Sequence, residues 1–257
     1  MRLNPFIAGL KGGNTQIGTW INMVHSPAIL ALLQSAGLDY ARVDMEHSAP
    51  SIETIANMAL LSRALGFPIL VRPPSAEREW ITRLLDVGVW GLHIPQVDTP
   101  AIAAKVVESA RYAPLGMRGV AGIGPHNDFT PGVDLRDMNE QVHITVMLES
   151  RQAFSHLDEI IATPGIDAVT LGPHDLAQDL GIVGNPDEMI IIDEHREQMI
   201  ASAKRHAKQV AMLCNTLEEA VRWSERGVQI IVFSSDVAMI RNAYSSVIAR
   251  LRPGTVS

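Results

Sequence analysis

The chain has 257 residues, which is long for one ordinary domain, and 47% of them are apolar while 19% are charged. This balance is typical of a globular protein with a sizeable core. The net charge of −7 argues against a nucleic-acid partner, and no apolar run approaches the roughly 20 residues of a membrane span. The N-terminus lacks the apolar stretch of a signal peptide, and the single cysteine, Cys214, fits a cytoplasmic location. We therefore expect a small-molecule substrate.

Short apolar runs, often β-branched, alternate with segments of helical spacing. Runs of this length suit buried parallel strands, which we expect at 17–21, 40–44, 68–72, 90–94, 143–148, 167–171, 209–213 and 228–233. The helical spacing predicts helices at 51–65, 100–111 and 216–226. Helix starts are indicated at Ser26-Pro27 and Ser235-Asp236, and helix stops at Gly37, Gly66 and Gly227.

Eight strands alternating with helices in a chain of this size predict an α/β fold, a closed (β/α)8 TIM barrel, as a single domain over 1–257. An open doubly wound sheet is the alternative, but no Gly-rich phosphate fingerprint follows the first strand. The stretch GIGPHN at 122–127 does not match that fingerprint. We expect the segment 113–141 to be irregular, and a loop this long usually carries function or forms an interface.

Polar residues gather where the predicted strands end, which is the end of such a barrel that carries the chemistry. They are Asp44, Glu46, His47, Arg72, His93, Gln96, Glu149, His174, Asp175, Cys214, Asn215 and Asp236. Any strand must end in solvent, so a single polar end means little. The whole set favours a site.

Glu149 and Asp175 follow neighbouring strands and could share one hard cation, with water and substrate oxygens completing its shell. The same two carboxylates would also suit a general acid/base pair. For each alone, an ordinary salt bridge or helix cap is an equal alternative, and Asp175 could cap a helix beginning near Leu176. No HxxxH or CxxC spacing exists, which argues against a structural zinc site.

Asp44 and His47 are three residues apart, which allows a carboxylate–imidazole hydrogen bond and hence a general base, although such a pair is more often structural. Arg72, on a buried strand, must find an anionic partner in the protein or the ligand. We expect Cys214 to be a small buried residue rather than a nucleophile. Without convergent spacing, five histidines are expected on loops or helix faces: His126, His143, His156, His195 and His206.

A Schiff-base mechanism would need a lysine at a strand end. The chain has only four lysines, and none lies at a predicted strand end: Lys11, Lys105, Lys204 and Lys208. We therefore do not expect Schiff-base chemistry.

The residues resemble the HpcH/HpaI aldolase family in order over nearly the whole chain. The matching segments are VDMEH (43–47), LVRPP (70–74), RLLDVG (83–88), IPQVDTP (94–100), RYAPLGMRGV (111–120), LES (148–150), GIDAVTLGPHDLAQDLG (165–181) and the strand at 227–236. The resemblance implies a class II aldolase that cleaves 4-hydroxy-2-oxo acids to pyruvate, or hydroxypyruvate, and an aldehyde. It also implies a swapped C-terminal helix and a homohexamer built as a trimer of dimers.

By the same resemblance, Glu149 and Asp175 would hold a divalent cation, Mg²⁺, Mn²⁺ or Co²⁺, which pyruvate would chelate. Arg72 would stabilise the enolate. His47, oriented by Asp44, would manage protons through water, and Asp86 would approach from an adjacent subunit. The residues implied in substrate binding are Arg72, Gly172, Pro173, His174 and Asp175.

Two residues depart from the family pattern. Met147 stands where many members carry glutamine, and His174 replaces a small residue in the turn before Asp175. Both indicate a donor or acceptor different from that of the best-known members. The alternatives are a citrate-forming condensing enzyme of the same family, which would use oxaloacetate, and a non-catalytic ligand-binding barrel. A metal-dependent cleavage assay separates the aldolase from the condensing enzyme, and the retained polar set speaks against the non-catalytic barrel.

Overall fold

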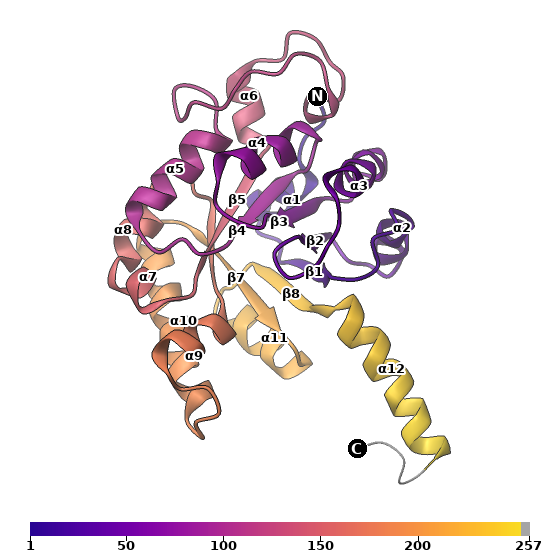
Figure 1. Ribbon diagram of the computed structural model, residues 1–257, viewed down its shortest axis with the longest axis vertical. Helices are drawn as coiled ribbons and strands as arrows, with labels where there is room; N and C mark the ends of the chain where they lie inside the picture. The colour runs from indigo at the N-terminus through magenta and orange to yellow at the C-terminus, as the bar shows by residue number, and fades with distance from the viewer. Residues whose placement is uncertain (253–257) are drawn as a thin grey trace.

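The computed structural model describes residues 1–252, so the last five residues of the expected domain lie outside the described part. Eight parallel strands close into a barrel in sequential order (Figure 1). They are β1 (Gln16–Ile21), β2 (Tyr40–Asp44), β3 (Ile69–Arg72), β4 (Gly91–Ile94), β5 (His143–Leu148), β6 (Ala168–Leu171), β7 (Gln209–Cys214) and β8 (Ile230–Ser235). The predicted barrel is confirmed, with each strand within two residues of its expected bounds.

Helices surround the barrel and connect its strands (Figure 1). They are α1 (Pro5–Lys11), α2 (Ala28–Ser35), α3 (Ile52–Leu65), α4 (Arg78–Asp86), α5 (Pro100–Ala110), α6 (Leu135–Glu140), α7 (Arg151–Ser155), α8 (Leu157–Ala162), α9 (Pro173–Leu180), α10 (Glu188–Arg205), α11 (Leu217–Glu225) and α12 (Asp236–Leu251). The predicted capping residues act locally. Ser235 caps α12 through its hydroxyl, and Gly66 ends α3 in the left-handed conformation. Across residues 1–252, none of the helices combines the length and apolarity that a bilayer span needs.

Successive side chains of a strand point to opposite faces, and this divides the apolar residues into two cores. The larger core fills the space between the strands and the outer helices, and the smaller one lies inside the barrel. Helix α1, which the sequence patterns did not predict, closes the N-terminal end of the barrel. Its Phe6 packs edge-on against Tyr40, with ring centroids 4.6 Å apart, and against His143 at 4.9 Å.

The segment 113–141 contains more regular structure than expected. It holds a 3₁₀ turn at Pro125–Asn127 and the helix α6. Asp134 accepts a hydrogen bond from the backbone of Arg136 and caps α6, while Met138 buries its side chain. A cap followed by one apolar residue is too short a pattern to reveal a helix of six residues.

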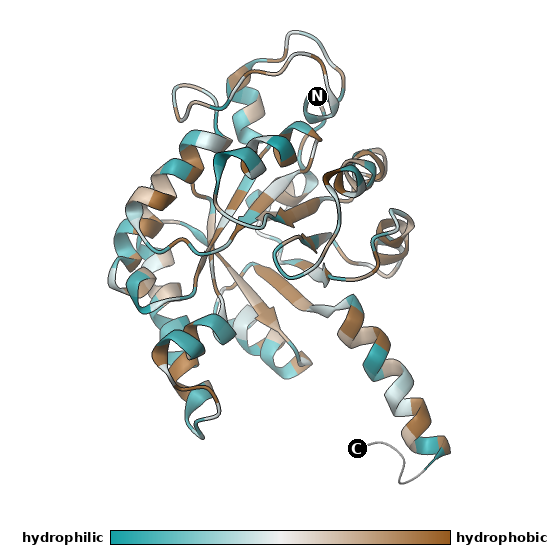
Figure 2. Cartoon of the chain, viewed as in Figure 1, coloured by the Kyte–Doolittle hydropathy of each residue, from teal (hydrophilic) through white to brown (hydrophobic). Residues whose placement is uncertain are grey.

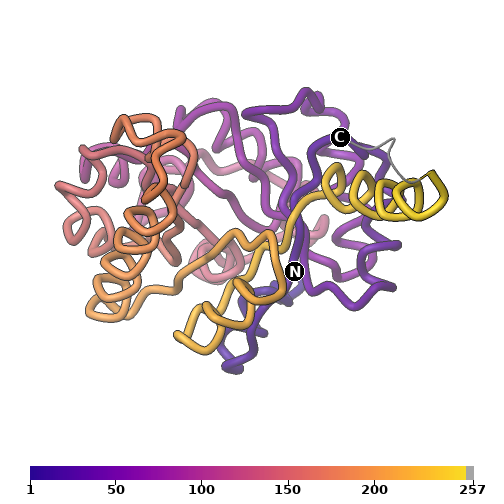
Figure 3. Tube along the Cα trace, turned by 90° about the horizontal axis from the view of Figure 1, so that it is seen from below, coloured from indigo at the N-terminus to yellow at the C-terminus, as the bar shows by residue number. Residues whose placement is uncertain are grey.

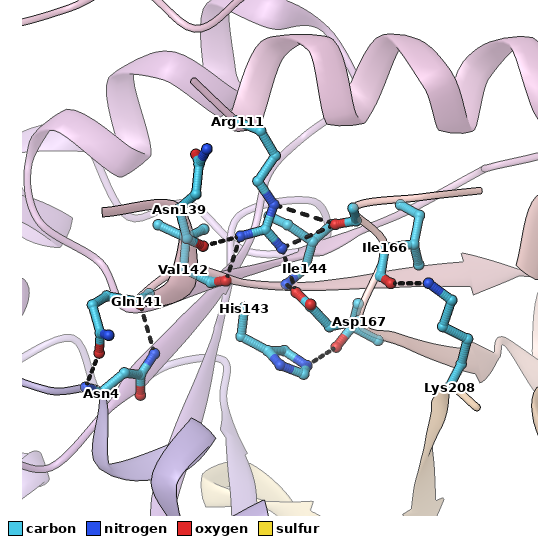
Figure 4. A network of polar contacts seen from close by, with 12 residues as sticks. Asn4, Arg111, Asn139, Gln141, Val142, His143, Ile144, Ile166, Asp167 and Lys208 are labelled. Atoms are coloured by element: carbon cyan, nitrogen blue, oxygen red, sulfur yellow. Dashed lines mark hydrogen bonds and ion pairs between the residues drawn. The ribbon is translucent and has the colours of Figure 1, made fainter. Parts of the chain in front are cut away.

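The N-terminal end of the barrel is tied together by Arg111, which follows α5 (Figure 4). Its buried guanidinium donates to the backbone oxygens of Asn139, Val142 and Gly165, and it forms an ion pair with Asp167 at 2.5 Å. One side chain therefore joins the segments that precede β5 and β6.

Helix α12 leaves the barrel instead of packing against it (Figures 1 and 3). Asp236, in its first turn, is the only buried residue within α12. Hydrophobic segments recur along the rest of this helix (Figure 2). Its Met239, Ile240 and Tyr244 are all at least half exposed. The last helix of the barrel thus leaves its own apolar residues uncovered.

Candidate active site

A cavity of about 350 Å³ opens at the C-terminal ends of the strands. Six of the predicted site residues line it: His47, Arg72, Gly172, Pro173, His174 and Asp175. A larger cavity of about 560 Å³ lies at the opposite end, around Arg111. There Arg111 and Lys208 already bind backbone oxygens (Figure 4), and the end itself is the one that serves stability in these barrels. The smaller cavity is therefore the candidate active site.

Arg72 and Asp44 form the centre of the site. Asp44 is fully buried at the end of β2, and Arg72 lies opposite it at the end of β3. The guanidinium binds both carboxylate oxygens, with Nε 2.8 Å from Oδ1 and Nη2 2.7 Å from Oδ2. Burial opposes ionisation, but the hydrogen bonds and charge of Arg72 hold the pKa of Asp44 below its ordinary value. The anionic partner that we expected for Arg72 is thus a protein carboxylate.

The expected side-chain pairing of Asp44 with His47 is wrong. Asp44 Oδ1 instead accepts from the backbone N–H groups of Glu46, at 2.9 Å, and His47, at 3.3 Å. The His47 imidazole is exposed, and its Nε2 lies 3.7 Å from Glu46 Oε2. Both Asp44 oxygens already bind Arg72 inside the barrel, and the chain turns outward after β2. His47 therefore lies at the mouth of the cavity.

Glu149 follows β5 and is almost completely buried. Its Oε1 accepts from the backbone N–H of Gln96 at 2.7 Å, and Gln96 adopts a φ of 54°. The pKa of Glu149 is raised to about 7, chiefly by burial, which the hydrogen bond from Gln96 opposes; the charges of Asp175 and Glu46 add to the rise and that of Arg72 reduces it. The Gln96 N–H thus holds the Glu149 carboxylate in place, while burial and two neighbouring carboxylates oppose its ionisation.

A divalent cation would compensate this negative charge. Within residues 1–252 no group of three or more His, Cys, Asp or Glu side chains is arranged as a complete metal site. Two protein carboxylates suffice, however, when substrate and water supply the other ligands of a Mg²⁺-type cation. The Glu46 carboxylate adds to the negative charge near Glu149. Burial raises the pKa of Glu46 as well. The donor set fits a hard cation.

Gly172 and helix α9 shape the wall beside Glu149. A Cβ atom on Gly172 would lie 2.4 Å from Glu149 Oε2, so the carboxylate occupies the space that a side chain would need. Gly172 is also the residue before α9, whose first turn contains Asp175. Asp175 therefore lies inside the helix start and does not cap it. The exposed N–H groups of such a start favour anions.

Asp86 does not reach the cavity of its own chain. It ends α4, where its Oδ1 accepts from Nη2 of the buried Arg118 at 2.6 Å. Arg118 lies in the segment 113–141, so Asp86 belongs to the surface that this segment forms.

Three other polar residues lie at the site without having been assigned a role by sequence. Glu46 contacts Arg72 Nη1 at 3.1 Å, and Gln96 positions Glu149 through its backbone. Arg42 lines the inner part of the cavity. Its position two residues before Asp44 places both on the inner face of β2, and that alternation is the signal that could have revealed it.

His143 is also not on a loop or helix face as expected. It begins β5 inside the barrel, where Nε2 lies 3.1 Å from Thr145 Oγ1.

The comparisons with known proteins agree with this arrangement. The family model of HpcH/HpaI aldolase/citrate lyase matches residues 16–243. The chain belongs to this family. The 5-keto-4-deoxy-D-glucarate aldolase of Klebsiella pneumoniae subsp. pneumoniae is 32% identical over 241 residues, 93% of either chain. The solved HpcH/HpaI aldolase of Desulfitobacterium hafniense is also 32% identical, with a TM-score of 0.88 over 97% of this chain and 98% of the other.

A solved citrate synthase shares the fold at 24% identity, with a TM-score of 0.85 over 96% of both chains. Membership of the HpcH/HpaI family and the aldolase relatives make this protein an enzyme, a carbon–carbon lyase of the aldolase type that cleaves a hydroxy-oxo acid. Small molecules are its substrates.

Proposed function

We propose that this aldolase is metal-dependent and cleaves 4-hydroxy-2-oxo acids to pyruvate, or hydroxypyruvate, and an aldehyde. Glu149 and Asp175 would hold Mg²⁺, Mn²⁺ or Co²⁺. The observation that carries this proposal is the buried Glu149 carboxylate, which lies near the carboxylates of Asp175 and Glu46, with Arg72 as the cation that offsets part of their charge. When bound, the cation supplies Lewis-acid polarisation of the 2-oxo group.

The remaining chemistry belongs to side chains of this chain. His47, at the mouth, would accept the proton of the C4 hydroxyl through water. The C3–C4 bond then breaks, the aldehyde leaves, and the electron pair remains as the pyruvate enolate, which takes a proton at C3 from water and so balances the proton lost by the C4 hydroxyl. Arg72 would stabilise the enolate oxygen, because Asp44 holds its guanidinium in one orientation. The N–H groups at the Gly172–Asp175 turn would receive the substrate carboxylate.

Metal removal tests the proposal. EDTA is expected to abolish cleavage of a 4-hydroxy-2-oxo acid, and Mg²⁺, Mn²⁺ or Co²⁺ to restore it, as measured by coupled detection of pyruvate.

Substitution of Arg72 tests its role in the same reaction. Arg72→Lys is expected to lose both cleavage and proton exchange at C3 of pyruvate, because lysine cannot bind Asp44 through two parallel N–H groups. Full activity in EDTA would overturn the metal mechanism, and normal proton exchange in the Arg72 variant would overturn its role.

We also propose a homo-oligomer in which α12 of one chain packs on a second copy. The side of the barrel that a helix after β8 would cover bears an apolar groove of about 430 Å³, lined by residues of β1, β8 and α11. Reciprocal exchange of α12 would cover this groove and the apolar residues of the helix together. A trimer of such dimers would let Asp86 approach an adjacent subunit's cavity.

The proposal includes a cytoplasmic location. The single cysteine, Cys214, is buried, and burial raises the pKa of its thiol to about 12. Such a thiol is unreactive and has no disulfide partner in the chain, which fits a reducing compartment.

A further inference from the structure

A buried carboxylate at the start of α12 holds the loop that follows β1. Asp236 is only 7% exposed. Its Oδ1 accepts from the backbone N–H of Asn22 at 3.0 Å. Its Oδ2 accepts from the backbone N–H groups of Met23, at 3.0 Å, and Val24, at 2.8 Å. Three successive N–H groups of one loop therefore bind the same side chain.

The side chain of Asn22 connects this loop to the centre of the active site. Asn22 lines the active-site cavity, and its Nδ2 donates to Asp44 Oδ2 at 3.0 Å. Asp44 in turn binds the Arg72 guanidinium through both of its oxygens. A continuous series of hydrogen bonds thus runs from Asp236 on α12 to Arg72 on β3.

Asn22 completes the set of donors that fixes the plane of the Asp44 carboxylate. The torsion between Cβ and Cγ of an aspartate is soft, so the carboxylate rotates readily unless donors hold both oxygens. The backbone N–H groups of Glu46 and His47 hold Oδ1. Asn22 holds Oδ2, to which Arg72 also donates. Without Asn22, the carboxylate and the guanidinium that it binds would be free to tilt together.

The position of Asn22 depends on Asp236, because the loop has little other support. Residues 22–24 belong to neither β1 nor α2, and the Met23 side chain is 71% exposed. A carboxylate has two acceptor oxygens and can bind all three N–H groups of the loop. An asparagine in its place would turn an NH₂ group, which only donates, toward some of them.

We propose that Asp236 is a positioning residue for the aldolase reaction, which holds the loop after β1 so that Asn22 orients Asp44 and thereby Arg72. This inference rests on the enolate-stabilising role proposed for Arg72 and adds the residues that give its guanidinium one orientation. Because Asp236 begins α12, the same contacts join the active site to the helix that leaves the barrel.

Proton exchange at C3 of pyruvate tests the inference, measured by NMR in deuterium oxide at saturating pyruvate and Mg²⁺. Asn22→Ala removes the side-chain donor to Asp44, and Asp236→Asn disrupts the loop. Each is expected to slow exchange about 10- to 100-fold, the effect of a small displacement of a catalytic group. The double variant should be no slower than the slower single variant, because both changes break the same series of hydrogen bonds.

Metal affinity separates this role from a general distortion of the site. Glu149 and Asp175 follow β5 and β6, away from the loop, so both single variants should bind Mn²⁺ with wild-type affinity by calorimetry. Asp39→Asn is the matched control. Asp39 also accepts from a backbone N–H of β1, that of Ile17 at 2.8 Å, but at the opposite end of the strand. This variant should exchange protons at the wild-type rate.

Three results would overturn the positioning role. They are wild-type exchange in Asn22→Ala, single effects that multiply in the double variant, and a loss of Mn²⁺ affinity as large as the loss of exchange. Asn22 is a half-buried loop residue, so its variant decides the question even where Asp236→Asn does not fold. Absence of exchange in the wild-type protein would instead overturn the proposed enolate chemistry, and the positioning role with it.

Discussion

Gly172 has no side chain, and the Glu149 carboxylate occupies the space that one would need. An added Cβ would lie 2.4 Å from Oε2 and 2.9 Å from the Glu149 Cβ. Since the backbone N–H of Gln96 holds the other carboxylate oxygen, Glu149 cannot rotate away without losing that hydrogen bond. The position of the proposed metal ligand thus depends on two backbone features of neighbouring loops.

We predict that Gly172→Ala lowers Mn²⁺ affinity by about 10-fold or more, in the range found when the support of a metal ligand is removed. Calorimetric titration of the metal-free protein measures this. Gly119→Ala is the control, because a Cβ there meets open space. Equal Mn²⁺ affinities of the two variants would show that Glu149 is not a ligand or is not confined by Gly172.

His143 makes the protein sensitive to acid. Burial lowers its pKa to about 4, against an ordinary value of 6.5. Below pH 6.5 the unfolded chain binds a proton that the folded chain refuses until about pH 4. The free energy of unfolding should therefore fall by about 3 kcal/mol as the pH decreases across this window. Above pH 7 the effect vanishes.

Urea unfolding of the wild type and of His143→Gln at several pH values between 7 and 4 checks this prediction. The quantity compared is the slope of stability against pH, because the substitution itself changes absolute stability. The glutamine variant should lose a clear part of the slope. Parallel curves would show that His143 does not contribute.

Single residues at the strand ends could be read from the sequence, but their partners could not. Arg72 was expected to need an anion, and the structure supplies Asp44. The choice between Asp44–His47 and Asp44–Arg72 depends on which way each side chain leaves its strand. Residue spacing along one segment does not contain that information, because the deciding contact joins β2 to β3.

At the scale of whole elements, Arg111 joins the end of α5 to the segments before β5 and β6. We predict that Arg111→Met destabilises the protein by about 3–5 kcal/mol, because it leaves buried carbonyl oxygens and Asp167 without their donor. Chemical unfolding measures the loss. Arg136→Met, at an exposed position on α6, should change stability by less than about 0.5 kcal/mol. A small effect at Arg111 would mean that water replaces the guanidinium.

The long elements were predictable and the short ones were not. Eight apolar runs revealed the strands, and 51–65 revealed α3, because each repeats its pattern over enough residues. Helix α1 has only two buried residues, Phe6 and Leu10, and its role depends on the open end of a barrel that forms from the rest of the chain. Such a helix is fixed by tertiary contacts rather than by its own sequence pattern.

At the scale of the whole molecule, α12 and the groove beside α11 are two uncovered apolar surfaces. We predict a hexamer in solution, measured by light scattering after size-exclusion chromatography at micromolar concentration. Ile240→Glu on the helix and Val221→Glu in the groove should each reduce the assembled mass, because both charges would be buried in the same interface. Glu194→Lys on α10 is the control and should keep the wild-type mass.

A wild-type chain that stays monomeric at tens of micromolar would contradict the exchange of α12. So would the two charged variants, if both kept the wild-type mass. The fold class follows from the chain's own periodicity, whereas the path of α12 after β8 does not. Its apolar residues have ordinary helical spacing, and only the structure reveals that its own barrel does not cover them.

Arg111, with the backbone oxygens that it binds, and the active-site cavity lie at opposite ends of the same eight strands. A substitution at the mouth of the cavity leaves the hydrogen bonds of Arg111 intact. The choice of substrate can therefore be changed without lowering the stability of the barrel. Variant libraries restricted to the exposed mouth of the active-site cavity should therefore yield folded proteins at high frequency. The same libraries placed around Arg111 would yield few. The barrel is thus a scaffold on which selection can explore new oxo acids without first adding stabilising mutations.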